Sequence, residues 1–296
     1  MISKSKSMKL AAVDIGSNAI RLQITRVLEN DNGKDEFKKL ESIRFPLRLG
    51  KDTFQTGEIT FRSEAKFINL METFRNMIDL YEADDFYGCA TSAMRDAANG
   101  QRILDRAYQK SGLAINLISG DTEADILNKA LYKYLDHKKY ILIDVGGGST
   151  EVNVVDNKKT IDRASFKLGS VRNMQGKDSE KTWEELSDWI KQTVKGKKGF
   201  TALGTGGNIR SLRDFIKGKP NKASYDELID AKEHIDSYSV DQRMTELGLR
   251  NDRADVIPYA SEIYLNIMKL SGCENMKIPD VGLKDGIIQM MYERNS

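Results

Sequence analysis

Carboxylates flank glycine turns at two places in the sequence, and together these residue types can hold a phosphate group. The first place is 14-DIGSN-18, and the second is 144-DVGGGS-149, which is followed by Glu151. A glycine turn lets backbone N–H groups approach an anion closely, because no Cβ stands in the way. Asp14 and Asp144 end apolar strands, where a magnesium ion or a network of bound water would compensate their charge. The two stretches therefore predict a site for a phosphate-bearing ligand.

A third glycine turn, 204-GTGGN-208, has the same form. A single turn of this kind is equally consistent with a plain hairpin, but two turns that each follow an aspartate favour phosphate binding from two sides. None of the three turns matches G-x-x-x-x-G-K-[ST], and none is the G-x-G-x-x-G of a Rossmann unit. The sequence therefore predicts neither a P-loop nor a dinucleotide-binding site.

Four further side chains could take part in phosphate chemistry, and each has a purely structural alternative. Glu151 could be a solvent-facing strand residue, and Glu123 could compensate the dipole of the helix whose first turn carries it. Arg21 and Arg95 lie near glycine turns, where a guanidinium suits a phosphate by its fork geometry. A lone arginine is, however, more often part of a surface ion pair.

The elements that must position these residues are duplicated in the sequence. The segment 13-VDIGSNAIRLQIT-25 aligns with 143-IDVGGGSTEVNVV-155 at an offset of 130 residues, and the two aspartates coincide. Each copy reads as an apolar strand, a turn and a second strand of alternating apolar and polar residues, which predicts a hairpin. We therefore expect two domains, 1–126 and 127–283, with a C-terminal helix at 284–296 that packs back on the first.

Hydrophobic periodicity predicts the remaining elements. Helices are expected at 63–82, 121–135, 182–195 and 284–294 and throughout a helix-rich region at 222–272. Strand, turn and helix are expected in succession at 84–97 and at 200–212, and further strands at 114–120 and 276–282. Asp121 or Thr122 is the expected N-cap of the helix at 121–135.

Composition limits the class of protein. The chain has 296 residues, 40% hydrophobic and 30% charged, and its net charge of +2 gives no general electrostatic case for binding nucleic acid or membranes. Two cysteines and two histidines are too few and too far apart for a disulfide framework or a histidine-rich metal site, so any catalysis must rely on carboxylates. The start of the chain has no apolar signal segment, and we expect a cytoplasmic protein.

Eight motifs that follow one another along the chain resemble those of a known family. They are 13-VDIGSNAIRL-22, 90-ATSAMRDA-97, 118-ISGDTEADIL-127, 143-IDVGGGSTEV-152, 168-LGSVR-172, 204-GTGGNIRSL-212, 253-RADVIP-258 and 282-GLKDGII-288. The set resembles the exopolyphosphatase and guanosine pentaphosphate phosphohydrolase family in a short two-domain form, within the superfamily of actin, Hsp70 and sugar kinases. The resemblance implies an α/β fold in which two ribonuclease-H-like domains flank an interdomain cleft.

The resemblance also implies roles for the candidate residues. It makes Glu123 the general base that aligns an attacking water. It makes Asp144 and Glu151 ligands of a magnesium ion, with manganese as an alternative, and gives Glu151 a second role at the water. Asp14 resembles a further metal-side carboxylate. The implied phosphate ligands are Asn18, Arg21, Arg95, Gly146, Gly147, Gly148, Ser149, Gly206 and Gly207.

The implied activity is metal-dependent hydrolysis of the terminal phosphoanhydride of inorganic polyphosphate, with release of orthophosphate. Guanosine pentaphosphate is an alternative substrate, and a nucleotide-binding switch without hydrolysis and a sugar or acid kinase are alternatives of other classes. Nucleic acid and membranes are not expected as partners, and a homodimer is left open. Basic residues could line a groove for polyphosphate or be solvated surface charge: Lys167, Arg172, Arg210 and Arg213.

The chain departs from the family pattern at three points. Thr122 stands where many relatives have a second glutamate, and Asn208 stands where many have threonine. The longer relatives add a C-terminal helical domain, whereas this chain stops at Ser296. We therefore expect a preference for shorter polyphosphate chains or for nucleotides.

Overall fold

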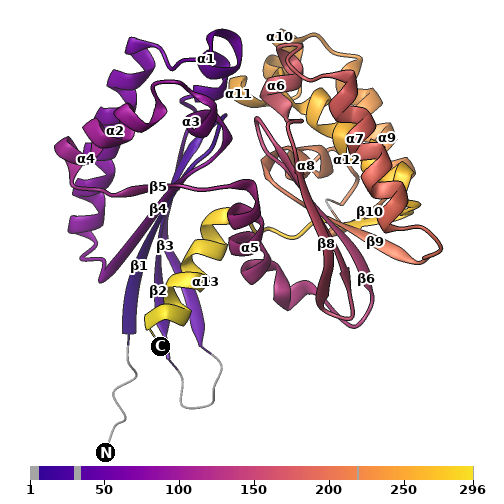
Figure 1. Ribbon diagram of the computed structural model, residues 1–296, viewed down its shortest axis with the longest axis horizontal. Coiled ribbons are helices and arrows are strands. Elements are labelled where there is room, and N and C mark those ends of the chain that lie inside the picture. The colour runs from indigo at the N-terminus through magenta and orange to yellow at the C-terminus, as the bar shows by residue number, and fades with distance from the viewer. Residues whose placement is uncertain (1–6, 30–34, 219, 296) are drawn as a thin grey trace, which may run out of the picture. The chain divides into compact units, whose positions relative to one another are not determined.

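The computed structural model describes residues 7–29, 35–218 and 220–295. The chain forms two compact units (Figure 1). Unit 1 contains Met1–Ala130 and Leu283–Ser296, and unit 2 contains Leu131–Gly282. The predicted domain boundary after residue 126 falls inside helix α5 (Gly120–Leu131).

Unit 1 is built on a five-stranded mixed sheet in the order β3-β2-β1-β4-β5. The strands are β1 (Ser7–Ile15), β2 (Ile20–Leu28), β3 (Glu36–Phe45), β4 (Asp85–Ala90) and β5 (Ile115–Leu117). The first three strands are antiparallel, and β4 and β5 run parallel to β1. The inner strand β1 is buried from Leu10 to Ile15, because it is covered on both faces. This sheet confirms the predicted hairpin.

Helices cover the sheet of unit 1. They are α1 (Leu49–Thr56), α2 (Phe61–Leu80), α3 (Ser92–Asp96), α4 (Gly100–Ser111), α5 and α13 (Leu283–Asn295). Helix α2 begins at the N-cap Thr60, whose side chain accepts a hydrogen bond from the backbone N–H of Ser63. Its buried residues include Phe67, Leu70 and Phe74, so the helix predicted at 63–82 is confirmed.

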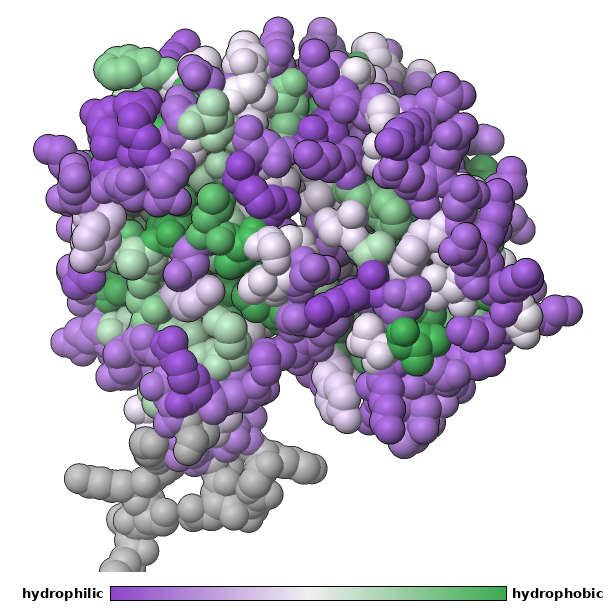
Figure 2. All heavy atoms as spheres, in the orientation of Figure 1, coloured by the Kyte–Doolittle hydropathy of each residue, from purple (hydrophilic) through white to green (hydrophobic). Residues whose placement is uncertain are grey.

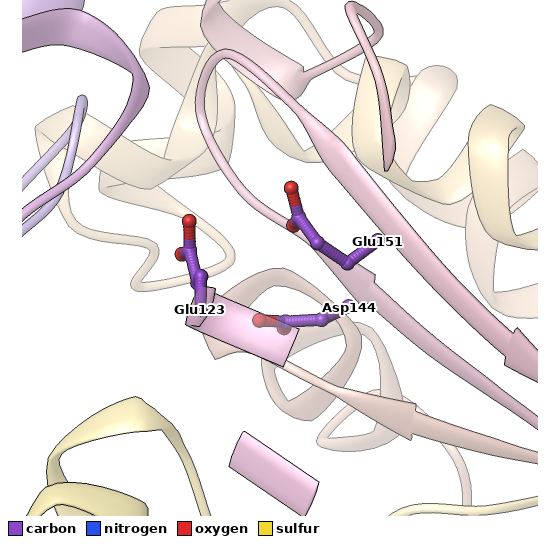
Figure 3. Close-up of side chains that lie close together, drawn as sticks. All are labelled: Glu123, Asp144 and Glu151. Atoms are coloured by element: carbon purple, nitrogen blue, oxygen red, sulfur yellow. The ribbon is translucent and has the colours of Figure 1, made fainter. Parts of the chain in front are cut away.

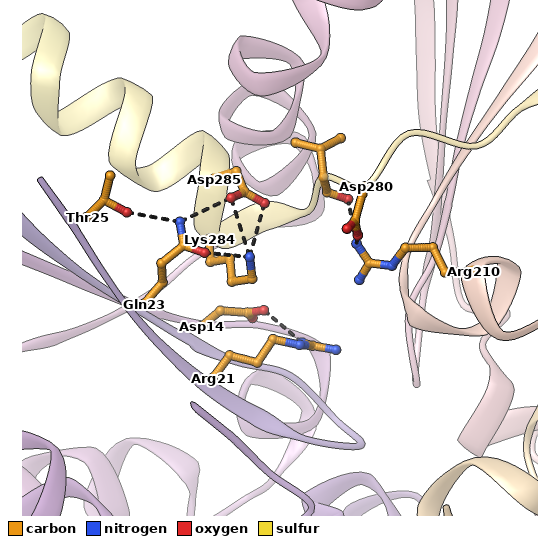
Figure 4. Close-up of polar contacts among 9 residues, drawn as sticks. Asp14, Arg21, Gln23, Thr25, Arg210, Asp280, Lys284 and Asp285 are labelled. Atoms are coloured by element: carbon orange, nitrogen blue, oxygen red, sulfur yellow. Dashed lines mark hydrogen bonds and ion pairs between the residues drawn. The ribbon is translucent and has the colours of Figure 1, made fainter. Parts of the chain in front are cut away.

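The C-terminal helix α13 packs on strands β1, β2 and β4 of unit 1 (Figure 1). Polar contacts join it to β2, as Figure 4 shows. Gln23 donates to Oδ1 of Asp285 over 3.1 Å and accepts from Lys284 over 2.5 Å, and its amide also contacts Thr25. Buried polar groups on β2 are thereby satisfied by the motif 282-GLKDGII-288.

Gly286 lies where α13 packs against the backbone of α5. A Cβ at this residue would overlap the backbone carbonyl of Ile126. We therefore expect Gly286→Ala to lower the free energy of unfolding by about 1–3 kcal/mol through overpacking. Urea unfolding followed by circular dichroism measures this cost. Gly282→Ala is the control, because a Cβ at this residue would meet no neighbouring atom, and its effect on stability should be close to neutral. Gly112→Ala is not a matched control, because Gly112 has a positive φ.

Unit 2 repeats the plan of unit 1 with one more strand, in the order β10-β11-β9-β6-β7-β8. Its strands are β6 (Lys139–Val145), β7 (Thr150–Asp156), β8 (Lys159–Phe166), β9 (Phe200–Thr205), β10 (Lys222–Ser224) and β11 (Asn275–Lys277). Three antiparallel strands are again followed by a strand parallel to the first. Both units are therefore of the predicted α/β, ribonuclease-H-like class.

The helices of unit 2 pack around α12 (Ile257–Ser271), which contacts α6, α7, α8 and α9. The remaining helices are α6 (Ser170–Met174), α7 (Glu180–Thr193), α8 (Gly207–Arg213), α9 (Tyr225–Asp236), α10 (Val240–Thr245), α11 (Asn251–Ala254) and the short 3-10 helix η1 (Tyr132–Tyr134). Helix α12 is apolar around most of its circumference, as a central helix must be. The helix-rich region at 222–272 is thus confirmed.

Some predicted elements differ from those observed. Strands β3 and β8 were not predicted, because most of their residues are exposed or half-buried and lack an apolar face. The strand predicted at 114–120 covers only Ile115–Leu117, and the strand predicted at 276–282 covers Asn275–Lys277. Residues 30–34 of the polar connection before β3 lie outside the described residues.

The molecular surface is largely polar. Hydrophilic side chains cover most of the face in Figure 2, with hydrophobic side chains between them. Among the described residues, no helix combines the length and the apolar character that crossing a membrane requires.

Candidate functional site

The glycine turn between β6 and β7 is held by helix α6. Gly146 closes the turn by donating its N–H to the carbonyl of Ser149 over 2.9 Å. The carbonyls of Gly146 and Gly147 accept bonds of 2.8–3.0 Å from the backbone N–H groups of residues 170–172. The carbonyl of Gly148 accepts from Nε of Arg172 over 2.8 Å. All three glycine carbonyls therefore point towards α6.

This arrangement directs the N–H groups of the turn to the opposite side. In a trans peptide the C=O and the following N–H point in opposite directions. Since the carbonyls of the three glycines face α6, the N–H groups of Gly147, Gly148 and Ser149 face away from it. Three successive N–H groups on one side form a concave site for an anion. The N–H groups of Gly147, Gly148 and Ser149 therefore share one side of the turn, whereas the N–H of Gly146 is already bonded to the carbonyl of Ser149.

Gly169 allows α6 to approach the turn. A Cβ at Gly169 would lie 2.5 Å from the backbone nitrogen of Gly148 and 2.6 Å from the carbonyl carbon of Gly147. We expect Gly169→Ala to displace the turn and to raise KM for a phosphate substrate by about 10-fold, the effect of losing roughly one good hydrogen bond. Steady-state kinetics measures the change. The control Gly282→Ala, whose Cβ would meet no neighbouring atom and whose φ is not positive, should leave KM unchanged.

The first glycine turn, between β1 and β2, has the same architecture in unit 1. Gly16 donates to the carbonyl of Ala19, and the carbonyl of Ser17 accepts from the N–H of Gly50 over 2.7 Å. The carbonyl of Asn18 accepts from the N–H of Arg48 over 3.2 Å. Backbone N–H groups at the start of α1 therefore bind the carbonyls of this turn, as those of α6 bind the carbonyls of the other turn. The predicted duplication thus extends to these hydrogen bonds.

The two hairpins differ in the charge of a facing pair close to the glycine turn. In unit 1, Asp14 lies opposite Arg21, and the two side chains form an ion pair of 2.8 Å (Figure 4). In unit 2, the corresponding residues Asp144 and Glu151 lie opposite each other. Unit 1 thus neutralises its aspartate internally, whereas unit 2 places two carboxylates on facing positions of adjacent strands.

The carboxylate pair of unit 2 is suited to a divalent cation. Directly opposite residues of an antiparallel pair have Cβ atoms about 4.5–5.5 Å apart, and like charges there are destabilising. Glu151 is 2% exposed and accepts from the hydroxyl of Ser165 over 3.0 Å, and Asp144 accepts from Thr205 over 2.9 Å. Oxygen donors of this kind fit Mg²⁺ or Mn²⁺. The burial of Glu151 shows that the alternative of a solvent-facing strand residue is wrong.

Glu123 lies in unit 1, on the first turn of α5. Its side chain is labelled in Figure 3, as are those of Asp144 and Glu151 of unit 2. The helix begins at Gly120, and the hydroxyl of Ser119 accepts the N–H of Thr122 over 3.1 Å. The expected N-cap, Asp121 or Thr122, was therefore wrong by two or three residues. The Thr122 hydroxyl bonds that of Ser119 over 3.0 Å.

The third glycine turn follows β9 in unit 2. Gly206 has φ +98°, which only glycine adopts without strain, and Gly207 lies directly against the guanidinium of Arg253. Nη1 of Arg253 also donates to the side-chain oxygen of Asn208. The departure from the family pattern at Asn208 is thus accommodated by a contact with the motif 253-RADVIP-258.

The arginines near the glycine turns have defined partners. Arg95 donates from Nη1 to the carbonyl of Ile118 over 2.7 Å, which fixes one side of its guanidinium. Arg210 forms an ion pair of 2.9 Å with Asp280 (Figure 4), and Arg213 donates to the carbonyl of Ile278. Arg210 and Arg213, which the sequence placed in a possible groove, are thus both tied to the segment from Ile278 to Asp280.

Sequence reasoning missed two residues of unit 2 that contact the site residues. Thr205 donates to Asp144, and Tyr264 bonds the backbone at both Val145 and Thr205. Thr205 lies inside the quoted turn 204-GTGGN-208 but was not singled out, and Tyr264 belongs to no quoted motif. Burial, and then the charge of Asp144, raises the pKa of Tyr264 far above its usual value, so its hydroxyl stays protonated.

Comparison with known proteins finds relatives that are named as phosphatases. A Fusobacterium nucleatum protein named bifunctional 3-dehydroquinate synthase/phosphatase is 29% identical and aligns with 92% of this chain and 45% of its own length. Exopolyphosphatase 1 of Mycobacterium tuberculosis is 28% identical and aligns with 56% of this chain and 47% of its own length. The alignments thus cover about half the length of these curated relatives.

The fold is shared with solved structures. The crystal structure of an exopolyphosphatase from Cytophaga hutchinsonii aligns with a TM-score of 0.83, at 18% identity, over 97% of this chain and 98% of the other. At this identity the likeness shows the fold. The sequence match to the Ppx/GppA phosphatase family, in contrast, extends over residues 26–295, which is most of the chain. The chain therefore belongs to the Ppx/GppA phosphatase family.

Proposed function

We propose that the chain hydrolyses the terminal phosphoanhydride of inorganic polyphosphate and releases orthophosphate, with Mg²⁺ or Mn²⁺ as cofactor. The observation that carries this proposal is the glycine turn of unit 2, whose N–H groups face away from α6 beside the facing carboxylates Asp144 and Glu151. An anion site next to a cation site is what phosphoryl transfer requires. The family membership supports the same chemistry.

The reaction needs a positioned water, a proton acceptor and neutralisation of the phosphoryl oxygens. We assign the proton acceptor to Glu123, which takes a proton from water while the water oxygen attacks the terminal phosphorus. The bond from phosphorus to the bridging oxygen breaks, and that oxygen leaves with the shortened chain. Glu151 orients the water. Glu123 then releases its proton to solvent, which completes the cycle.

Asp144 and Glu151 would hold the metal ion, with Asp14 as a further carboxylate on the metal side. A metal ion bound there supplies positive charge to the phosphoryl oxygens. The N–H groups of Gly147, Gly148 and Ser149 bind the oxygens of the phosphoryl group. The other assigned phosphate ligands are Asn18, Arg21, Arg95, Gly206 and Gly207, whereas the N–H of Gly146 is bonded inside the turn and is not assigned to phosphate.

The ion pair between Arg21 and Asp14 bears on the roles assigned to both, phosphate binding for Arg21 and metal binding for Asp14. An arginine held by a 2.8 Å ion pair keeps its guanidinium in one orientation, with further N–H donors remaining in its fork. Arg21 can therefore bind a phosphate oxygen without reorganisation. The same pair makes Asp14 a weaker candidate for metal ligation than Asp144, because its charge is already neutralised.

Phosphate release from defined substrates tests the proposal. The purified chain is incubated with polyphosphates of short and long chain length and with guanosine pentaphosphate, each with Mg²⁺ and with EDTA. We expect orthophosphate from polyphosphate in the presence of Mg²⁺ and none with EDTA. Release from guanosine pentaphosphate alone would assign the alternative substrate. If neither compound yields phosphate while a nucleotide binds, the hydrolase proposal fails and a nucleotide-binding switch takes its place.

A further inference from the structure

Four groups at the end of the unit 2 sheet are joined in a closed ring of bonds. The backbone N–H of Val145 donates to the hydroxyl of Tyr264 over 3.2 Å, and this hydroxyl donates to the carbonyl of Thr205. The hydroxyl of Thr205 donates to Oδ1 of Asp144 over 2.9 Å. Asp144 and Val145 are neighbours in the chain, so the ring closes through their peptide bond.

The ring lies where two parallel strands end. Asp144 and Thr205 are partners in the register of β6 and β9, and each strand leads directly into a glycine turn. Beyond this point β6 and β9 are no longer paired, so the hydrogen bonds of the sheet do not hold the two segments together. The Tyr264 hydroxyl provides a bridge there, accepting from one strand end and donating to the other. It therefore sets the distance between the starts of the two turns.

Tyr264 is well placed to act as a rigid bridge. It projects from the middle of α12, the central helix of unit 2, and is 1% exposed. A tyrosine has two side-chain torsions, and tight packing of the ring leaves its hydroxyl little freedom. A Cβ added at Gly206 would lie 3.2 Å from this hydroxyl and 3.1 Å from Oδ1 of Asp144, which shows how closely the third glycine turn packs against the ring.

We propose that Tyr264 is a positioning residue that fixes the carboxylate of Asp144 and the glycine turn after Thr205 for metal and phosphate binding. This inference rests on the proposed function, in which Asp144 is a metal ligand. The terminal torsion of an aspartate is soft, and the bond from Thr205 selects one orientation of the carboxylate plane. Tyr264 holds Thr205 in place through its carbonyl, so it acts on Asp144 through Thr205.

A matched control for Tyr264→Phe is available on β6, the strand that carries Asp144. Tyr140, at the other end of β6, is also completely buried, and its hydroxyl also makes two bonds, to Asp136 over 2.9 Å and to Lys277 over 2.7 Å. Tyr140→Phe removes the same atom from an equally buried position far along the strand from Asp144. It therefore measures what the loss of a buried hydroxyl does to stability alone.

Titration with Mn²⁺ alone, followed by electron paramagnetic resonance, compares the wild-type chain with both variants. We expect Tyr264→Phe to weaken Mn²⁺ binding by about 10- to 100-fold, the effect usual for residues that orient metal ligands. Tyr140→Phe should bind Mn²⁺ as the wild type does. Circular dichroism establishes that each variant is folded. In phosphate-release assays, Tyr264→Phe should raise the Mg²⁺ concentration for half-maximal activity by a similar factor.

A second variant keeps the test decisive if Tyr264→Phe does not fold. Thr205→Val keeps the shape of the side chain and removes its bond to Asp144, and the same weakening of Mn²⁺ binding is expected. Unchanged Mn²⁺ affinity in a folded Tyr264→Phe or Thr205→Val variant would overturn the proposal, as would a wild-type chain that binds no Mn²⁺. A different result would refute only the proposed hydrolysis: the wild-type chain releases no phosphate, while the two variants still bind Mn²⁺ more weakly than the wild type does.

Discussion

Replacing Glu123 with glutamine is expected to lower kcat for phosphate release by about 10²- to 10⁴-fold, the usual contribution of a general base. Glutamine has the size of glutamate and can still accept a hydrogen bond, but it cannot take up the proton of the attacking water. Substrate binding does not need that proton transfer, so KM should change little. Steady-state kinetics on polyphosphate with saturating Mg²⁺ separates the two constants.

The control for this experiment lies two residues further along the same helix. Asp125 is exposed on α5, and Asp125→Asn removes one negative charge from the same helix end without touching the assigned base. It should keep kcat within about twofold, the range of a surface substitution. Full activity in Glu123→Gln would refute the assignment of the base, and an equal loss in both variants would show that only the charge of the helix matters.

Glu151→Gln is expected to change activity and stability in opposite directions. Phosphate release should fall on the order of 10²-fold, because the facing pair loses one of the two charges that hold the cation. In EDTA, however, the free energy of unfolding should rise by about 0.2–1 kcal/mol, because the repulsion between Asp144 and Glu151 across β6 and β7 is removed. Glutamine keeps an oxygen that can accept the hydroxyl of Ser165.

Urea unfolding with EDTA and with Mg²⁺ measures the second effect. The wild-type chain should gain stability from Mg²⁺, since an ion that binds only the folded state stabilises it, and Glu151→Gln should gain less. Ser165→Ala serves as a control that removes the hydroxyl next to Glu151 and keeps both carboxylates. A variant Glu151→Gln that is less stable than wild type in EDTA would show that the carboxylate pair is not under repulsion.

The sequence predicts most of the backbone at this site. Apolar strands that end in aspartate and glycine identify both hairpins, because the turn requires residues without a Cβ and the strands require a buried face. Strands β3 and β8 escape this reasoning because they extend the sheet outward, where few side chains are buried. Their position is set by hydrogen bonds to β2 and β7, which involve the backbone of any residue type.

Side chains that act through other residues were harder to predict. Tyr264 is 120 positions from Asp144 in the chain and lies in an apolar helix, where a tyrosine reads as an ordinary core residue. Arg172 belongs to a quoted motif, yet only the structure shows that its Nε donates to the carbonyl of Gly148. Such contacts depend on tertiary packing, and neither periodicity nor spacing along the sequence carries that information.

The facing positions in the two hairpins record how a duplicated fold acquires unequal halves. Both copies keep the strand, the aspartate and the glycine turn, and the offset of 130 residues brings Arg21 of one copy onto Glu151 of the other. An arginine at that position forms an ion pair with the facing aspartate, whereas a glutamate leaves two carboxylates on facing positions. Repeated scaffolding therefore carries a balanced ion pair in one unit and a pair of like charges in the other, and under the proposed function only the second pair depends on a cation.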